Sequence, residues 1–266
     1  MSATAVLLSG GLDSAVLAAE EAVRAGSPGS PGGNDGGDIQ PIYVSVGLAW
    51  EEAERAMLAR LLASPLFRAR VRPLVALTVD MRDVYEATHW AVQGTPPAYH
   101  TPDEDVYLPG RNVILLGKAG VFCAAARIDR LVLGTLGHNP FPDATPAFRS
   151  AMAHALSLGL ARTLVIDAPY ADVGKADVIR RGAALGVPFE LTLSCMNPKG
   201  FGIRDSGFAR DSISHESHES HESQIPNPKS LLHCGTCSKC RERHDAFIEA
   251  GVADPTEYAD VRYVDA

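Results

Sequence analysis

The sequence has no run of about 18 consecutive apolar residues, the length that a membrane-spanning helix needs, so we expect no membrane segment. It opens without a basic leader or a small-residue cleavage site, and we therefore expect no secretory signal. Basic residues are in deficit, because 24 lysines and arginines stand against 32 aspartates and glutamates. Duplex binding depends on basic side chains that neutralise phosphates, so we expect no duplex nucleic acid partner. These absences favour a cytoplasmic protein.

Cysteine is also scarce, with five in 266 residues, an odd number that does not suit a disulfide framework. Three of them, Cys234, Cys237 and Cys240, are crowded into seven positions. This crowding is typical of a metal site in a reducing compartment. A structural zinc ion takes four tetrahedral ligands, and we expect Cys195 to supply the fourth.

Other ligands and another metal remain open for this site. His233 and His244 are alternatives for the fourth position, and an iron–sulfur cluster is an alternative to Zn²⁺ because it also uses four cysteines. The fifth cysteine, Cys123, lies among apolar residues with helical spacing, so we expect it to be a buried small hydrophobe.

The chain is rich enough in apolar residues, at 46%, to bury a core, and its apolar patterns alternate between strand and helix. This alternation predicts a doubly wound α/β fold, with a parallel sheet that is covered on both faces. We expect strands at 3–8, 41–46, 71–79, 131–134 and 163–168, and helices at 12–24, 51–62, 112–126, 146–158 and 175–185.

Two polar stretches interrupt this pattern. Residues 26–38 are almost entirely Gly, Ser, Pro, Asn and Asp, and residues 205–229 contain three successive His-Glu-Ser repeats. Both predict exposed flexible loops. We expect an α/β domain over residues 1–190 and a zinc-binding C-terminal segment over residues 191–266, with a final short strand or a tail after Tyr258.

The strongest chemical signal is Ser9-Gly10-Gly11-Leu12-Asp13-Ser14, between the first expected strand and the first helix. Two glycines let backbone N–H groups surround an anion at the positive end of a helix. A carboxylate would oppose phosphate binding by itself, so Asp13 indicates a divalent cation such as Mg²⁺. The Gly-Lys-Ser/Thr ending of a Walker loop and the Gly-x-Gly-x-x-Gly dinucleotide pattern are both absent.

This loop resembles the pyrophosphate loop of N-type ATP pyrophosphatases, and further segments narrow the resemblance. They are Leu-Pro-Gly-Arg-Asn at 108–112, Phe-Pro-Asp at 141–143, Gly-Lys-Ala-Asp-Val-Ile at 174–179, and the four cysteines in order and spacing. Taken together they resemble the 7-cyano-7-deazaguanine synthases of the queuosine pathway over about residues 5–243.

The resemblance implies an adenine nucleotide α-hydrolase-like, Rossmann-like fold and an ATP-dependent ligase. Such an enzyme adenylates 7-carboxy-7-deazaguanine and uses ammonia to form the nitrile, through an amide, with release of AMP and pyrophosphate. It implies ATP, Mg²⁺ and Zn²⁺ as cofactors. The ATP-binding residues that it implies are Leu8, Ser9, Gly10, Gly11, Leu12, Asp13, Ser14, Tyr43, Ser45 and Gly134. The implied catalytic residues are Asp13, Arg111, Lys175 and Asp143. The implied substrate-binding residues are Arg111, Asn112 and Asp143.

Each of these side chains also has a purely structural interpretation. Arg111 can pair with a surface carboxylate, and Lys175 can be a solvated residue in the first turn of a helix. Asn112 can cap a helix, and Asp143 can form a turn with Pro142. The segment around Tyr43 can be ordinary core strand.

The sequence departs from the family pattern at three places: Ala144-Thr145-Pro146 follows Asp143, Ser45-Val46-Gly47-Leu48 follows the second strand, and His138-Asn139 stand where an acidic residue is expected. These departures fall near the expected base pocket and the ATP rim. A divergent pyrophosphatase that activates another carboxylate or a tRNA base is therefore an alternative, and so is a non-catalytic nucleotide-binding module. A homodimer is also left open.

Overall fold

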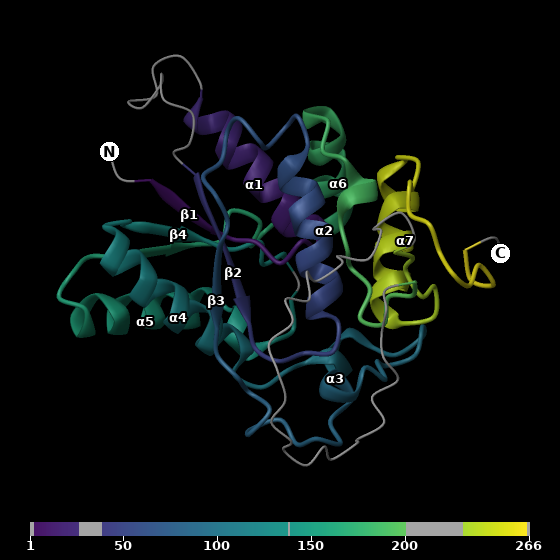
Figure 1. Ribbon diagram of the computed structural model, residues 1–266, viewed down its shortest axis with the longest axis horizontal. Helices are drawn as coiled ribbons and strands as arrows, with labels where there is room; N and C mark the ends of the chain where they lie inside the picture. Colours follow the sequence, from purple (N-terminus) through teal and green to yellow (C-terminus); the bar gives the residue numbers. More distant parts are fainter. Residues whose placement is uncertain (1–2, 27–38, 138, 201–230, 265–266) are drawn as a thin grey trace, which may run out of the picture.

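The computed structural model describes residues 3–26, 39–137, 139–200 and 231–264 (Figure 1). Five strands form a single parallel sheet in the order β3-β2-β1-β4-β5. The strands are β1 (Thr4–Leu7), β2 (Ile39–Ser45), β3 (Val75–Thr78), β4 (Arg130–Val132) and β5 (Val165–Asp167). Strand order reverses between β1 and β4, and ligands of open α/β sheets bind beyond the carboxyl ends of strands at such a reversal.

Helices cover both faces of the sheet, as the alternating pattern predicts. The helices α1 (Leu12–Ala25), α6 (Lys175–Leu185) and α7 (Ser238–Ala250) lie on one side, and α4 (Arg111–Ala126) and α5 (Pro146–Gly159) lie on the other (Figure 1). The helix α2 (Glu51–Ala63) contributes to both apolar cores, because Met57 packs in one and Leu58 in the other.

Local sequence explains where several helices begin and end. The helix α6 ends at Gly186, whose φ of 70° is left-handed, as the sequence predicts. The Thr145 hydroxyl accepts the backbone N–H of Phe148 at 3.2 Å and so caps the start of α5. The helix α4 begins after Gly110, which also has a left-handed backbone, with φ of 76°.

The expected α/β fold is confirmed, although some elements differ from the expectation. The strand expected at 71–79 is confined to Val75–Thr78, and Val71 forms only an isolated bridge to Ile39. Regular structure continues beyond residue 188, where the sequence gives no clear helical pattern, because α7 is a regular helix. The element possible after Tyr258 is not a strand within the described residues, since Tyr258 makes one isolated bridge to His233.

The C-terminal segment packs directly on the α/β domain, with α7 against α6. Lys199 and Leu232 exchange two backbone hydrogen bonds of 2.9 and 3.0 Å, so the segments after Cys195 and before Cys234 lie side by side. The predicted insertion at 26–38, apart from Gly26, and the polar loop at 205–229 lie outside the described residues. No helix in the described ranges combines the length and the apolar character that crossing a membrane requires.

Candidate functional site

The pyrophosphate-like loop joins β1 to α1 at the carboxyl edge of the sheet. Gly10 has a left-handed backbone, with φ of 83°, and a Cβ there would lie 3.1 Å from Leu58 Cγ, so a larger residue would strain the loop against α2. Ser14 Oγ donates to the carbonyl of Gly11 at 2.9 Å and lies 3.3 Å from Ser9 Oγ. The loop therefore presents two hydroxyl groups beside the N-terminus of α1, which attracts anions.

Asp13, in the first turn of α1, is paired on one side only. Its Oδ2 lies 3.1 Å from Lys175 Nζ, while its Oδ1 is buried without a hydrogen-bond partner among the described residues. Burial raises the pKa of Asp13, and so does the nearby Glu242 carboxylate, whereas Lys175 lowers it. An unpartnered buried carboxylate oxygen is costly unless a cation or donor completes it. This atom fits a divalent cation such as Mg²⁺, which prefers oxygen ligands.

Lys175, the first residue of α6, lies between two carboxylates. Besides Asp13, its Nζ contacts Glu242 Oε1 at 2.6 Å, and Glu242 belongs to α7. Burial alone would lower the pKa of Lys175, but the two carboxylates raise it. Lys175 is therefore a charged amine held beside the loop rather than a solvated helix residue. Sequence reasoning missed Glu242, because it is 67 residues away from its partner.

One cavity of about 270 Å³ brings the loop together with the second group of predicted residues. Ten of the residues expected in the site line it: Leu8, Ser9, Gly11, Asp13, Ser14, Tyr43, Arg111, Asn112, Gly134 and Asp143. Four do not: Gly10, Leu12, Ser45 and Lys175. The Ser45 hydroxyl instead donates to Glu51, whose carboxylate also accepts the backbone N–H of Val46 at 2.7 Å.

Gly134 follows β4 and forms part of the floor of this cavity. A Cβ at Gly134 would lie 3.3 Å from the backbone of Asp13 and Ser14, so the absence of a side chain lets the chain approach the loop closely. The end of β4 therefore packs directly against the backbone at the start of α1.

Among the described residues, no carboxylate lies within ion-pair distance of Arg111, so the structure does not contain the surface ion pair that was the alternative for this residue. Arg111 lines the cavity, and its Nε is buried without a hydrogen-bond partner in the described ranges. Its charge acts on Glu54, a cavity residue that sequence reasoning missed. Glu54 Oε2 accepts the hydroxyl of Tyr43 at 2.9 Å. Burial raises the pKa of Glu54 to about 7, although Arg111 and hydrogen bonds from Tyr43 and Trp50 lower it. The cavity is thus lined by the guanidinium group of Arg111 and by the carboxyl group of Glu54, whose pKa is near neutral.

Asn112 and Asp143 face each other across the cavity wall. Asp143 Oδ2 accepts the backbone N–H of Asn112 at 2.9 Å, and Asn112 Nδ2 donates to the backbone carbonyl of Asp143 at 3.1 Å. Asp143 therefore caps α4 from a distant segment of the chain. Beside them, the rings of Tyr107 and Phe141 stack with centroids 5.0 Å apart, and both rings line the cavity.

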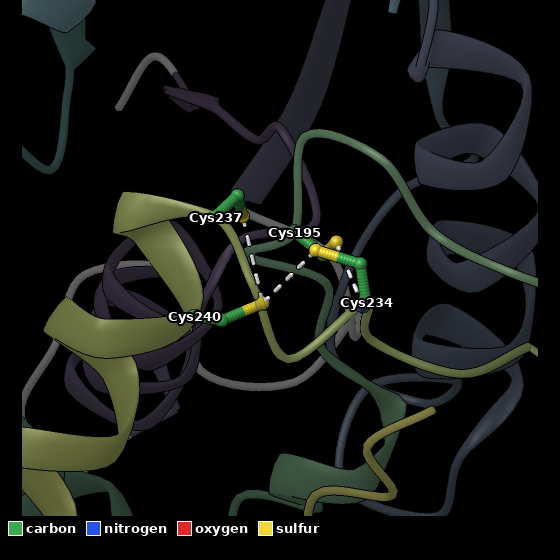
Figure 2. Close-up of side chains that lie close together, drawn as sticks. All are labelled: Cys195, Cys234, Cys237 and Cys240. Atoms are coloured by element: carbon green, nitrogen blue, oxygen red, sulfur yellow. Dashed lines mark hydrogen bonds between the residues drawn. The ribbon is translucent and has the colours of Figure 1, made fainter. Parts of the chain in front are cut away.

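The four cysteines predicted as metal ligands lie together, with their sulfur atoms all within 4.8 Å of one another (Figure 2). Each of these cysteines is at most 3% exposed. Tetrahedral zinc with Zn–S bonds of about 2.3 Å separates its sulfurs by about 3.8 Å, so this donor set fits the ion. Backbone N–H groups of Asn197 and Cys234 donate to Cys195 Sγ at 3.3 and 3.2 Å and support a thiolate there. These residues could hold a metal ion.

The alternative ligands lie outside this cluster. His233 Nε2 accepts the backbone N–H of Ser194 at 3.2 Å, and His244 Nδ1 lies 3.9 Å from Asp254 Oδ2. Cys123 is fully buried within α4, and burial raises the pKa of its thiol to about 12, as suits a small hydrophobe.

Arg243, in α7, is fully buried. Its guanidinium group donates to the backbone carbonyl of Phe189 at 2.9 Å, to Thr192 Oγ1 at 2.9 Å and to Thr256 Oγ1 at 2.6 Å. It therefore fastens α7 to the segment that precedes Cys195.

A parallel sheet of Rossmann-like order, with Ser-Gly-Gly-Leu-Asp-Ser at the junction of β1 and α1, defines the class as adenine nucleotide α-hydrolase-like α/β proteins. The family model described as queuosine biosynthesis protein QueC matches residues 95–251. The chain is 30% identical over 278 residues to 7-cyano-7-deazaguanine synthase from Methanopyrus kandleri, an alignment that covers 97% of this chain and 99% of that protein. It therefore belongs to the QueC, or 7-cyano-7-deazaguanine synthase, family.

Other relatives agree with this placement. The enzyme of the same name from Methanoculleus marisnigri is 29% identical, with 95% of this chain and 96% of that protein covered. The one from Allorhizobium ampelinum is 36% identical over 58% of this chain and 54% of that protein. A solved structure, the U34-tRNA thiolase NcsA from Methanococcus maripaludis with its 4Fe-4S cluster, is 14% identical in sequence. The match covers 70% of this chain and 58% of the thiolase chain. Its TM-score of 0.43 is too low to bear on function.

Proposed function

We propose that the protein is an ATP-dependent carbon–nitrogen ligase that converts 7-carboxy-7-deazaguanine and ammonia to 7-cyano-7-deazaguanine, with AMP and pyrophosphate as the other products. The observation that carries the proposal is the single cavity lined both by the Ser9–Ser14 loop and by Arg111, Asn112 and Asp143. Adenylation needs this proximity, because the carboxylate of the acid must reach the α-phosphorus of ATP.

The loop would hold the phosphates of ATP. Its backbone N–H groups, the hydroxyls of Ser9 and Ser14, and the ammonium group of Lys175 supply the donors. Asp13 would hold Mg²⁺ through Oδ1, the carboxylate oxygen that has no hydrogen-bond partner in the described part of the chain. The ion would supply charge neutralisation as pyrophosphate leaves.

The adenine would lie over the end of β2, next to Tyr43 and to the bare backbone at Gly134, which also line the cavity. Ser45 lies outside the lining, so any contribution it makes to ATP binding would be through the adjoining backbone of β2. The hydroxyl of Tyr43 is already held by Glu54.

The deazapurine acid would occupy the other part of the cavity. Arg111 Nε is buried and has no hydrogen-bond partner among the residues that the structure describes, so the guanidinium group would bind the carboxylate or the developing phosphate charge. The Tyr107 and Phe141 rings offer an apolar surface for a planar heterocycle. Asp143 and Asn112 already bond to each other, but a carboxylate has about four acceptor sites, so Asp143 retains capacity for ring N–H groups.

The proposed chemistry follows from the difference between acid and nitrile. The carboxylate oxygen attacks the α-phosphorus and pyrophosphate departs; ammonia then attacks the acyl carbon, AMP leaves with the C–O electron pair, and an amide forms. A nitrile has lost both carboxyl oxygens, so the amide oxygen must be adenylated in turn and leave on a second AMP. The residues of this chain bind, orient and neutralise charge in both rounds.

Two of the three departures from the family pattern have structural roles beside the cavity. Ala144 is buried, and Thr145 caps α5, and neither residue lines the cavity. The Ser45–Gly47 segment is held by the Glu51 carboxylate, which accepts from Val46 and Gly47. At the third departure, Asn139 does line the cavity, so this is the departure that bears on which acid binds.

The test is a mass spectrum of the products from 7-carboxy-7-deazaguanine, ATP, Mg²⁺ and ammonia. We expect the nitrile, with AMP and pyrophosphate, and no nitrile when ammonia is omitted. ADP as the nucleotide product, or no acid-dependent pyrophosphate release, would overturn the proposal. Parallel reactions with other planar acids and with tRNA distinguish a divergent pyrophosphatase from this enzyme.

A further inference from the structure

The ion-pair chain that begins at the pyrophosphate-like loop ends on the helix that carries the last cysteine of the cluster. Lys175 Nζ lies 3.1 Å from Asp13 Oδ2 and 2.6 Å from Glu242 Oε1. The other oxygen of Glu242 accepts from Lys239 Nζ. The three elements α1, α6 and α7 thus meet at one ammonium group.

The pairing is largely shielded from water. Side-chain exposure is 14% for Lys175, 24% for Asp13 and 21% for Glu242. Both carboxylate oxygens of Glu242 have a lysine partner, Lys175 Nζ at 2.6 Å and Lys239 Nζ. Lys175 therefore has a second acidic partner, and it lies closer to that partner than to Asp13.

Glu242 affects how available the Asp13 carboxylate is to a cation. Among the described residues, Asp13 and Glu242 are the carboxylates within ion-pair distance of Lys175. Without Glu242, the ammonium group would be left to Asp13 alone and would compete with a cation for its carboxylate. With Glu242, the ammonium group is shared, and Asp13 Oδ1 has no hydrogen-bond partner within the ranges that the structure describes.

We propose that Glu242 is a positioning residue that draws the ammonium group of Lys175 toward α7 and so keeps Asp13 available to Mg²⁺ at the ATP site. This inference rests on the proposed function, because it takes ATP and Mg²⁺ as the ligands of the loop. It assigns to the C-terminal segment a part in nucleotide binding that acts through Lys175 and Asp13.

The test is the affinity for ATP, measured by calorimetry on the full chain with and without Mg²⁺. In wild type we expect Mg²⁺ to tighten ATP binding. In Glu242→Gln we expect the Mg²⁺-dependent part of the affinity to fall by about tenfold, the scale of one charge-assisted hydrogen bond. Binding of ATP without Mg²⁺ should be unchanged or tighter, because one negative charge near the phosphates is gone.

Glu249→Gln is the matched control, since it makes the same charge change on an exposed position of α7. Glu242→Asp keeps the carboxylate one methylene shorter and should restore part of the Mg²⁺ dependence, a rescue that a purely structural role would not require. Metal content and melting temperature confirm that each variant keeps the cysteine cluster and the fold.

The outcomes separate the two proposals. Absence of Mg²⁺-dependent ATP binding in wild type would overturn the proposed function itself. Wild-type binding with an unchanged Mg²⁺ dependence in Glu242→Gln, or a loss equal to that in Glu249→Gln, would overturn the positioning role alone. An equal loss with and without Mg²⁺ would also overturn it, because the mechanism acts through the cation.

Discussion

The side chain of Asp143 accepts the backbone N–H of Asn112, 31 residues earlier, at 2.9 Å, and so anchors the start of α4 to the segment that follows β4. The sequence offers Asn112 as either a helix cap or a substrate contact, and Asp143 as either a turn residue or a substrate contact. In the structure Asp143 supplies the cap, and both residues line the cavity. Stability and substrate affinity should therefore change together when this pair is broken.

The first prediction concerns Asp143→Ala. The loss of a helix-capping acceptor should lower the free energy of unfolding by about 1 to 2 kcal/mol, measured by denaturant titration. The KM for the acid should rise as well. Thr145→Ala is the matched control: it removes the cap of α5, which is outside the cavity, so it should cost similar stability and leave KM unchanged. Equal kinetic effects in both variants would assign Asp143 a structural role alone.

The second prediction concerns Asp13→Asn. We expect AMP formation to fall by roughly 10²- to 10³-fold, because a neutral amide cannot hold the cation that neutralises the departing pyrophosphate. The melting temperature should change little, since Lys175 keeps Glu242 as an anionic partner. Asp83→Asn, at an exposed site, supplies the control. Undiminished turnover in Asp13→Asn would exclude the metal role.

The third prediction concerns the cysteine cluster. Cys237→Ser should abolish binding of one metal ion per chain, read by elemental analysis, and destabilise the fold by several kcal/mol. Cys123→Ala removes a buried thiol outside the cluster and should keep the full metal content. We expect zinc, which is colourless; iron with visible absorbance would show that the cluster alternative is the right one.

The fourth prediction uses the pH dependence of stability. The pKa of Glu54 rises from its ordinary value of 4.5 to about 7 in the folded protein, chiefly through burial. Between these values the folded protein keeps a proton that the unfolded chain has released, so stability falls as pH rises through this window and levels off above it. The loss is no more than about 3 kcal/mol.

Glu54→Gln should escape this loss, because the amide stays neutral and can still accept from Tyr43. Its melting temperature relative to wild type should therefore increase from about pH 5 to about pH 8. Glu52→Gln, on the exposed side of the same helix, should follow the wild-type profile. Parallel pH profiles for wild type and Glu54→Gln would contradict a raised pKa at this position.

Contiguous segments made most of the fold and part of the candidate site predictable. The loop at Ser9–Ser14 lies where a strand meets a helix, and short apolar runs and helical spacing indicate the surrounding strands and helices. Cys195 could be assigned to the metal site although it is 39 residues before Cys234, because the resemblance supplies its order and spacing. The helix α7 was harder to predict, because its charged residues obscure the two apolar positions, Ala246 and Phe247, that it buries.

The residues that were missed depend on contacts between distant segments. Glu242 meets Lys175 across 67 residues, and neither has a local pattern that points to the other. Glu54 lies among ordinary helix-forming charges, and only the burial of α2 against β2 turns it toward Tyr43. Likewise, no local sequence pattern indicates that the Ser45 hydroxyl donates a hydrogen bond to Glu51 instead of lining the cavity. Such pairings are set by packing, which a single sequence does not encode in its spacing.

The paired backbones of Lys199 and Leu232 have a practical consequence. This bridge lies four residues after Cys195 and two residues before Cys234, so it fixes the spacing of two of the four clustered cysteines through the backbone alone. Proline at either bridge position would remove one of the two N–H donors. Such a substitution should therefore weaken metal retention although neither residue is a ligand.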